Sequence, residues 1–392
     1  MSYRKFSADY LFDGHRLLGK DQVLITDEAG MIHQVCGIED AGEGIEFLPG
    51  LISPGFINCH CHLELSHLRG LIPRKTGLVD FVFAVVSRRR TGPDQIREAI
   101  ANAELEMISE GIVAVGDICN TADTIPLKSA ARLDYYNFIE SIGWLPSQAR
   151  ERFTESRNLY NHFIVAGADP DRLALVPHAP YSVSKELWAC LKPGFAGKTI
   201  TIHNQETAAE DEFFTAATGQ LTRMYEMMKI DNSWFNPTGS GSLDFYLDEL
   251  KGAAKIILVH NTCSTPADLQ RMKEMGPGLF CCLCPNANEY IEGRLPDIAA
   301  MEKLDMPIVI GTDSLASNSR LSVLEELKTI RKNQPHIAIE RLLTWATSNG
   351  ARALQMEHSL GDFTKGKKPG IVLIGSPGQD LLGPESRCRR LL

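Results

Sequence analysis

Two histidines spaced two residues apart follow an apolar run near the beginning of the chain. The run 48–57 has the length and the flanking glycines of a buried strand, and His60 and His62 come just after it. Side chains at positions i and i+2 of a strand point to the same side, so these two imidazoles can bind one metal ion. The alternative is a strand end with two solvated or hydrogen-bonded histidines.

Three later strand-like runs also end in residues that can bind a metal or move a proton. His203 and Glu206 follow the run 198–202, His260 follows 255–259, and Asp313 follows 306–312. In a barrel of alternating strands and helices, catalytic residues lie at the C-terminal ends of different strands. The recurrence of this arrangement therefore predicts one site at one end of a barrel.

The rest of the chain supplies the elements that such a barrel needs. Apolar runs alternate with helical patterns, which favours parallel strands. The eight predicted strands are 51–58, 111–118, 134–141, 172–177, 198–202, 255–259, 279–283 and 307–311. Helices are predicted at 94–109, 146–166, 266–275 and 322–333.

The sequence resembles the amidohydrolase superfamily, specifically its mononuclear deaminase and chlorohydrolase branch. The matching motifs are Pro54-Gly55-Phe56-Ile57-Asn58-x-His60-x-His62, His203-x-x-Glu206, His260 after the sixth strand, and Gly311-Thr312-Asp313-Ser314-x-x-Ser317-Asn318. The resemblance covers about 48–349. It implies an α/β fold, a (β/α)8 TIM barrel of the metal-dependent hydrolase type with a small β-sandwich formed by the N- and C-terminal segments.

The resemblance also implies a division of the chain. Residues 1–50 would form the N-terminal part of the β-sandwich, 51–350 the barrel, and 351–392 the C-terminal part and tail. Within the first part, a hairpin is predicted from 22–26 and 31–35. The stretch 370–374 would be the returning strand, and the tail beyond it is expected to be loosely ordered.

The family pattern assigns His60, His62, His203 and Asp313 as the ligands of one divalent metal, zinc or else iron. Some members of the superfamily bridge two metals through a modified lysine on the fourth strand. Here that strand ends at Val176-Pro177-His178 without a lysine, which favours a single metal.

The same pattern assigns the chemistry. A metal-bound water with a pKa near 7 would provide hydroxide, oriented by His260 and Asp313, and Glu206 would transfer protons as the general acid/base. The alternative for Glu206 is a surface glutamate at the start of an acidic helix. The alternative for His260 is a histidine that caps a strand end.

Substrate contacts are predicted at Glu64, His178 and Tyr181. The alternative for Glu64 is a structural salt bridge. Ser314 and Asn318 are expected to brace Asp313 and its loop. The basic run 88–90 is interpreted as a solvated helix end, with an anion-binding role as the alternative.

The leading functional prediction is hydrolytic deamination of an aminopurine or nucleoside derivative: aminofutalosine, an adenosine-type nucleoside or guanine. Hydrolysis of a cyclic amide, as in imidazolonepropionase, and dechlorination are the enzymatic alternatives. A non-catalytic metal-binding scaffold is disfavoured, because the chain has all the predicted ligands and proton-transfer residues: His60, His62, His203, Glu206, His260 and Asp313.

The composition of the chain narrows the classes of protein to which it can belong. Of the residues, 44% are hydrophobic and 23% charged, as in a globular protein, and the net charge of −9 gives no basic surface for nucleic acid. No apolar stretch reaches transmembrane length, and the N-terminus lacks the pattern of a signal peptide. We expect a cytoplasmic enzyme with a small-molecule substrate, no membrane partner, and a homodimer as one compatible assembly.

Overall fold

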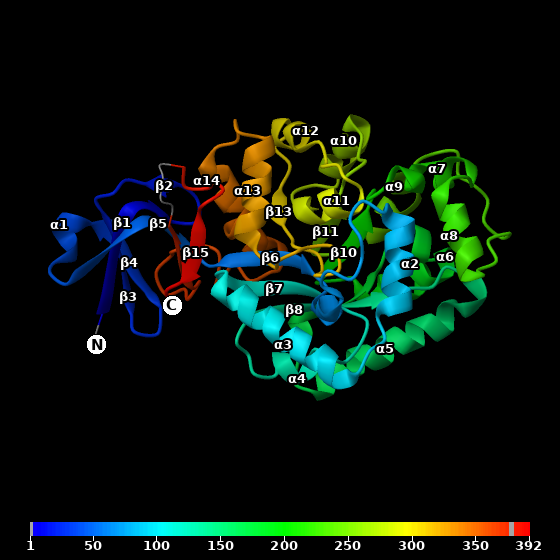
Figure 1. Cartoon of the computed structure of the whole chain (residues 1–392), viewed down its shortest axis with the longest axis horizontal. Helices are drawn as coiled ribbons and strands as arrows, with labels where there is room; N and C mark the ends of the chain where they lie inside the picture. Colours follow the sequence, from blue (N-terminus) through cyan, green and yellow to red (C-terminus); the bar gives the residue numbers. More distant parts are fainter. Residues whose placement is uncertain (1–2, 376–379) are drawn as a thin grey trace.

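The barrel strands form two four-stranded parallel sheets, each with its strands in chain order, and helices surround them (Figure 1). The computed structural model describes residues 3–375 and 380–392. One four-stranded sheet contains β6 (Phe56–Cys61), β7 (Ile112–Cys119), β8 (Asp134–Ser141) and β9 (Leu173–Pro177). The other contains β10 (Thr199–Asn204), β11 (Lys255–His260), β12 (Leu279–Leu283) and β13 (Ile308–Ile310). Each strand predicted from residue 111 onward corresponds to one of them.

The two sheets meet along two seams, with β9 beside β10 and β13 beside β6. At the first seam the amide of His203 donates to the carbonyl oxygen of His178 at 2.9 Å. At the second, the amides of Thr312 and Asp313 both donate to the carbonyl oxygen of His60, at 3.0 and 3.1 Å. The strands therefore follow one another around the ring as the (β/α)8 arrangement requires.

Helices alternate with these strands and begin at recognisable caps. Thr265 starts α10 (Pro266–Glu274), since its hydroxyl accepts from the amide of Asp268 while the Asp268 carboxylate accepts from the Thr265 amide. The helices that matter for the site are α2 (Leu78–Arg88), α7 (Ala208–Ala216) and α8 (Gln220–Met228).

The predicted helices are present, with small changes at their ends. They are α3 (Pro93–Ser109), α5 (Ala149–Val165), α10 and α13 (Val323–Asn333), and a 3-10 turn at Pro146–Gln148 precedes α5. Among the described residues, no helix combines the length and the apolar character needed to cross a membrane.

Strands from both ends of the chain form one seven-stranded sheet beside the barrel (Figure 1). Its members are β1 (Tyr3–Phe12), β2 (Leu17–Leu18), β3 (Gln22–Asp27), β4 (Ile32–Gly37), β5 (Ile45–Pro54), β14 (Ile371–Gly375) and β15 (Arg387–Arg390). The pairing of β3 with β4 confirms the predicted hairpin, and the pairing of β14 with β5 confirms the returning strand.

The prediction of one strand at 51–58 is wrong. The apolar run is divided between β5 of the terminal sheet and β6 of the barrel, and the chain changes sheets at Gly55. Both strands are buried, so hydropathy alone does not separate them. The domain boundary predicted between residues 50 and 51 falls within β5.

The prediction of a loosely ordered tail after residue 375 is wrong in part. Residues 376–379 lie outside the described residues, but β15 pairs antiparallel with β14. The sequence of β15, Arg387-Cys388-Arg389-Arg390, has no apolar pattern because it lies at the edge of the sheet. Charged residues are common on such edge strands.

Because Gly55 lies where the chain passes between sheets, a side chain there should destabilise the protein. An added Cβ would lie 2.3 Å from Val113 Cγ1 and 2.7 Å from the carbonyl oxygen of Pro369. We expect Gly55→Ala to lower the free energy of unfolding by about 1–3 kcal/mol, measured by chemical denaturation. The control is Gly19→Ala, whose Cβ would meet nothing within 4 Å. Equal stability of the two variants would contradict this account of the junction.

Candidate active site

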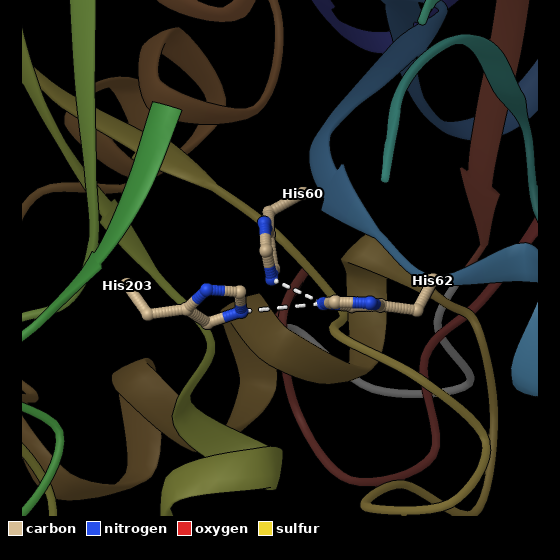
Figure 2. A group of neighbouring side chains, drawn as sticks. All are labelled: His60, His62 and His203. Carbon is tan, nitrogen blue, oxygen red and sulfur yellow. Dashed lines mark hydrogen bonds between the residues drawn. The ribbon is translucent and has the colours of Figure 1, made fainter. Parts of the chain in front are cut away.

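Three imidazole nitrogens converge at the C-terminal end of the barrel strands (Figure 2). His60 lies on β6, His62 follows that strand, and His203 lies on β10. The Nε2 atom of His62 lies 3.2 Å from Nε2 of His60 and 3.3 Å from Nε2 of His203. All three side chains are buried. The structure thus brings together the histidines that the sequence predicts as ligands.

The protonation of His203 suits a metal ligand. Its Nδ1 donates to the carbonyl oxygen of His178 at 2.8 Å, which places the ring proton on Nδ1 and leaves the Nε2 lone pair free. Burial, with the nearby rings of His178 and His60, lowers the pKa of His203 to about 3. Burial likewise lowers the pKa of His62, and the neighbouring His60 adds to the effect. Neutral imidazoles are the form that binds metals.

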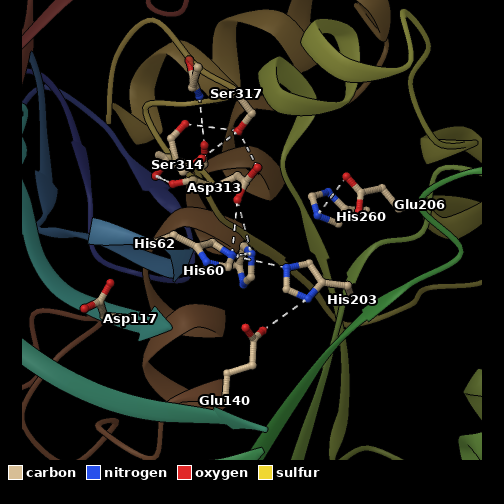
Figure 3. Close-up of polar contacts among 12 residues, drawn as sticks. His60, His62, Asp117, Glu140, His203, Glu206, His260, Asp313, Ser314 and Ser317 are labelled. Carbon is tan, nitrogen blue, oxygen red and sulfur yellow. Dashed lines mark hydrogen bonds and ion pairs between the residues drawn. The ribbon is translucent and has the colours of Figure 1, made fainter. Parts of the chain in front are cut away.

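Asp313 completes the group from the end of β13 (Figure 3). Its Oδ1 lies 3.5 Å from His62 Nε2 and 3.7 Å from His60 Nε2. Burial alone would raise the pKa of Asp313, but its electrostatic interactions with the rings of His60, His62 and His260 outweigh burial and lower it. The Ser317 hydroxyl donates to Oδ2. Ser314, which the sequence predicts as the brace, contacts Ser317 at 3.3 Å.

The spacing of the three imidazole nitrogens suits a divalent metal, and Asp313 Oδ1 lies near two of them. Ligand atoms 2.0–2.2 Å from zinc lie about 3.3–3.6 Å from one another in a tetrahedron. The separations given above run from 3.2 to 3.7 Å. Three buried imidazole nitrogens this close to one another are typical of a shared cation. The donor set of three imidazoles and one carboxylate therefore fits the predicted mononuclear centre.

Glu206 lies beside this group, although it precedes the acidic helix α7. Its side chain is only 4% exposed, which argues against a surface role. The Glu210 carboxylate, also buried, accepts from the amides of Gln205 and Glu206 at 3.1 and 2.8 Å and fixes the segment. Burial raises the pKa of Glu206 well above its usual range, and the charge of Asp313 adds to this. Glu206 is thus suited to carry a proton near neutral pH.

His260 faces Glu206 from the end of β11. The Asn288 side-chain amide donates to Nδ1 of His260 at 3.3 Å, which leaves Nε2 as the protonated nitrogen, 3.6 Å from Glu206 Oε1. Burial lowers the pKa of His260 well below its usual value.

The backbone at this end of the barrel takes left-handed conformations at non-glycine residues. His260 and Asn261 have φ of 72° and 55°, and Asp313 has φ of 56°. Such backbone is costly and persists where surrounding contacts hold it. The Asn261 amide donates to the carbonyl oxygen of Asn204 at 3.0 Å, and the Asn204 side-chain amide donates to Asn261 Oδ1, also at 3.0 Å. Left-handed backbone therefore occurs at two residues of the proposed chemistry, His260 and Asp313, as it does at several residues elsewhere in the chain.

A cavity of about 610 Å³ opens onto the metal ligands. This volume lies in the range of small-molecule sites, about 300–1,000 Å³. The residues predicted to contact substrate or to act on it, Glu64, His178, Tyr181, Glu206 and His260, line the cavity, and so does Ser314, which was predicted to brace Asp313. Asn318 lies behind Asp313, where its side-chain amide donates to the Thr312 carbonyl oxygen and to Glu326.

Glu64 is a buried carboxylate whose two oxygens are both engaged by the protein. Oε2 accepts from the amides of Asn120 and Thr121 at 2.9 and 2.8 Å and from the Thr121 hydroxyl at 3.0 Å. Oε1 pairs with Arg89 at 3.1 Å. Burial raises the pKa of Glu64 to about 7. Arg89 therefore binds a carboxylate of the chain itself, at the end of α2 where the sequence predicts a solvated basic run.

Sequence reasoning missed two parts of the cavity. One is Glu140, which is the second-last residue of the predicted strand 134–141 and of β8. A carboxylate at the C-terminal end of a barrel strand is a signal from which it could have been predicted. The other is an apolar wall, which no local sequence pattern indicates because it depends on how α2 and α8 pack over the barrel. Its residues are Leu78, Phe81, Val82, Val85, Val86, Trp144, Met224, Tyr225, Met228 and Ile230.

The sequence profile of the amidohydrolase family matches residues 51–383. This chain belongs to the amidohydrolase family. The match spans β6 to β13 and includes every residue of the metal and proton-transfer groups described above.

Individual proteins of known name are similar to this amidohydrolase. An aminodeoxyfutalosine deaminase from Deinococcus radiodurans is 28% identical over 315 residues, which cover 78% of this chain and 73% of the relative. A Helicobacter pylori aminofutalosine deaminase in complex with methylthio-coformycin aligns with a TM-score of 0.79 at 22% identity, covering 96% and 93% of the two chains. A Xanthomonas campestris adenosine deaminase with bound zinc aligns with a TM-score of 0.75 at 22% identity, covering 96% and 87%.

If these four ligands hold one ion, the purified amidohydrolase should contain about one divalent metal per chain. Asp313→Ala should lose most of it, because one ligand is gone and the three remaining nitrogens must bind alone. Metal content by plasma mass spectrometry is the measurement. The control is Cys61→Ala, since Cys61 lies between His60 and His62 and points to the other face of β6. Two tightly held metals per chain, or full retention by Asp313→Ala, would contradict the assignment.

Proposed function

We propose that this amidohydrolase is a hydrolytic deaminase of adenine nucleosides that carry an extended, mainly apolar 5′ substituent. The observation that carries the proposal is one cavity with two unlike ends: a buried metal-ligand group with Glu206 and His260, and the apolar wall of α2 and α8. The names of the relatives, deaminases of adenosine and of aminofutalosine-type nucleosides, support the same substrate class.

We propose zinc as the metal, with iron as the alternative. Metal analysis of the purified protein decides between them. The three imidazoles and one carboxylate suit zinc, and one structural neighbour contains it. When bound, the metal supplies an activated water as the nucleophile.

The residues of the chain then move the protons. Water adds to the ring carbon that bears the amino group, and Glu206 gives its proton to the adjacent ring nitrogen. His260, with its Nε2 proton directed into the same space, donates to the oxygen that becomes the product carbonyl. Glu206 then takes the proton of the added hydroxyl and passes it to the amino group, which leaves as ammonia, so the overall change is adenine plus water to hypoxanthine plus ammonia.

The first experiment follows hydrolysis of five compounds: ammonia release from adenosine, 5′-methylthioadenosine and guanine, ring opening of a cyclic amide, and chloride release from 6-chloropurine riboside. We expect 5′-methylthioadenosine to have the highest kcat/KM of the five. Hydrolysis of the cyclic amide alone would contradict the deaminase proposal and favour the imidazolonepropionase-like alternative.

Glu206→Gln tests the proton transfer. The change preserves size and removes the titrating proton, so we expect kcat to fall about 10²–10⁴-fold while metal content is retained. The matched control is Glu212→Gln, at an exposed position of the same acidic helix, which should keep normal kcat. Near-normal kcat in Glu206→Gln would exclude this residue as the general acid.

The apolar wall should set the preference for the 5′ group. Val85 lines this wall, and Val85→Asp would place a charge against the substituent. We expect the ratio of kcat/KM for 5′-methylthioadenosine over adenosine to fall about tenfold or more. Val165→Asp is the control, because Val165 is 88% exposed at the end of α5. An unchanged ratio in Val85→Asp would show that the 5′ group binds elsewhere.

A further inference from the structure

Glu140 is a buried carboxylate of the cavity that the proposed chemistry does not use. It lies at the end of β8 with 6% of its surface exposed, and it lines the cavity together with His178 and His203. Figure 3 shows it reaching the His203 ring from the side away from Asp313 and His260. Its position is therefore next to the reaction centre, but outside the group that transfers protons.

One oxygen of Glu140 is held and the other faces the cavity. The Asn120 side-chain amide donates to Oε2 at 2.9 Å. Oε1 lies 3.7 Å from His203 Nδ1, whose proton goes instead to the carbonyl oxygen of His178. Within residues 3–375 and 380–392, no group donates a hydrogen bond to Oε1. An ionised buried carboxylate with a free oxygen needs a donor.

The neighbouring carboxylate, Glu64, provides the contrast. Its oxygens accept from Asn120, Thr121 and Arg89. Asn120 connects the two carboxylates, since its backbone amide donates to Glu64 and its side-chain amide to Glu140. Glu64 therefore fixes Asn120, and Asn120 directs the free oxygen of Glu140 into the cavity.

A second metal ion is a poor occupant for this position. Glu140, His178 and His203 do lie close enough to surround an ion. However, His203 donates through Nδ1 to a carbonyl and directs Nε2 to His62. Only two protein ligands would remain, and the ion would lie beside the first metal, whose charge repels it. Uncharged donors such as hydroxyl groups satisfy a carboxylate without that cost.

We propose that Glu140, held by Asn120 and facing the cavity beside His178, accepts hydrogen bonds from the 2′ and 3′ hydroxyls of the substrate's ribose and makes the enzyme specific for ribonucleosides. The inference rests on the proposed nucleoside deaminase activity and adds the group that recognises the sugar. A carboxylate has lone pairs enough for two hydroxyl donors besides Asn120. A site built to pair with a substrate hydroxyl rejects an analogue that lacks it, because its own polar group is then left unpaired.

The test compares 5′-methylthioadenosine with its 2′,3′-dideoxy analogue. We expect the zinc-loaded protein to favour the ribonucleoside by about 100-fold or more in kcat/KM. In Glu140→Gln, an amide donor can face the hydroxyls in place of an acceptor, so the ratio should fall below about tenfold with metal content unchanged. Glu212→Gln is the matched control. It makes the same change at an exposed position outside the cavity and should preserve the ratio.

Three results would overturn the inference: no discrimination by the unmodified protein, full discrimination retained in Glu140→Gln, or loss of metal in Glu140→Gln. The last would make Glu140 a positioning residue for His203.

Binding separates this inference from the proposed activity. If no aminopurine nucleoside releases ammonia, the deaminase proposal fails. Calorimetry with inosine and 2′,3′-dideoxyinosine then decides the sugar contact alone. A preference for inosine that Glu140→Gln abolishes supports it, and the absence of any preference or binding overturns it.

Discussion

The convergence of three imidazoles and one carboxylate on a single point is the constraint on which the rest of the structure depends. The ligands lie at the two seams between the four-stranded sheets. His60 and Asp313 are joined across one seam by a backbone hydrogen bond, and His203 and His178 across the other. A cation held here would therefore link both half-barrels. The ring nitrogens lie about 3.2–3.3 Å apart, and the surrounding fold holds them in this arrangement.

Buried carboxylates hold the loops around this point. Glu210 accepts from the amides before α7, Glu64 from the amides after β7, and Asp117 from the Leu63 amide at 2.9 Å just beyond His62. Glu326 accepts from the amide of Asn286 and from the side chain of Asn318. Each carboxylate satisfies backbone or amide donors that water cannot reach. The same device supports the proton-transfer residues and, through Asn120, the free oxygen of Glu140.

The sequence predicted much of the barrel and its ligands, because a buried parallel strand is a local apolar run and a histidine or aspartate just beyond it lies at the reactive end. The sequence did not predict the contacts between segments that lie far apart in the chain. The apolar run around Gly55 belongs to two sheets, and β15 lacks an apolar pattern. Arg89 pairs with Glu64, and the wall from α2 and α8 depends on how distant helices pack. The roles assigned to the site residues, the homodimer and the cytoplasmic location stay predictions, since each depends on a ligand, a partner or a cell.

The most direct measurement of the central claim is a crystal structure of the zinc-loaded protein with anomalous diffraction at the zinc edge. The account predicts one peak within about 2.0–2.2 Å of Nε2 of His60, His62 and His203 and of a carboxylate oxygen of Asp313. A peak between Glu140 and His178, or two peaks of equal height, would contradict it.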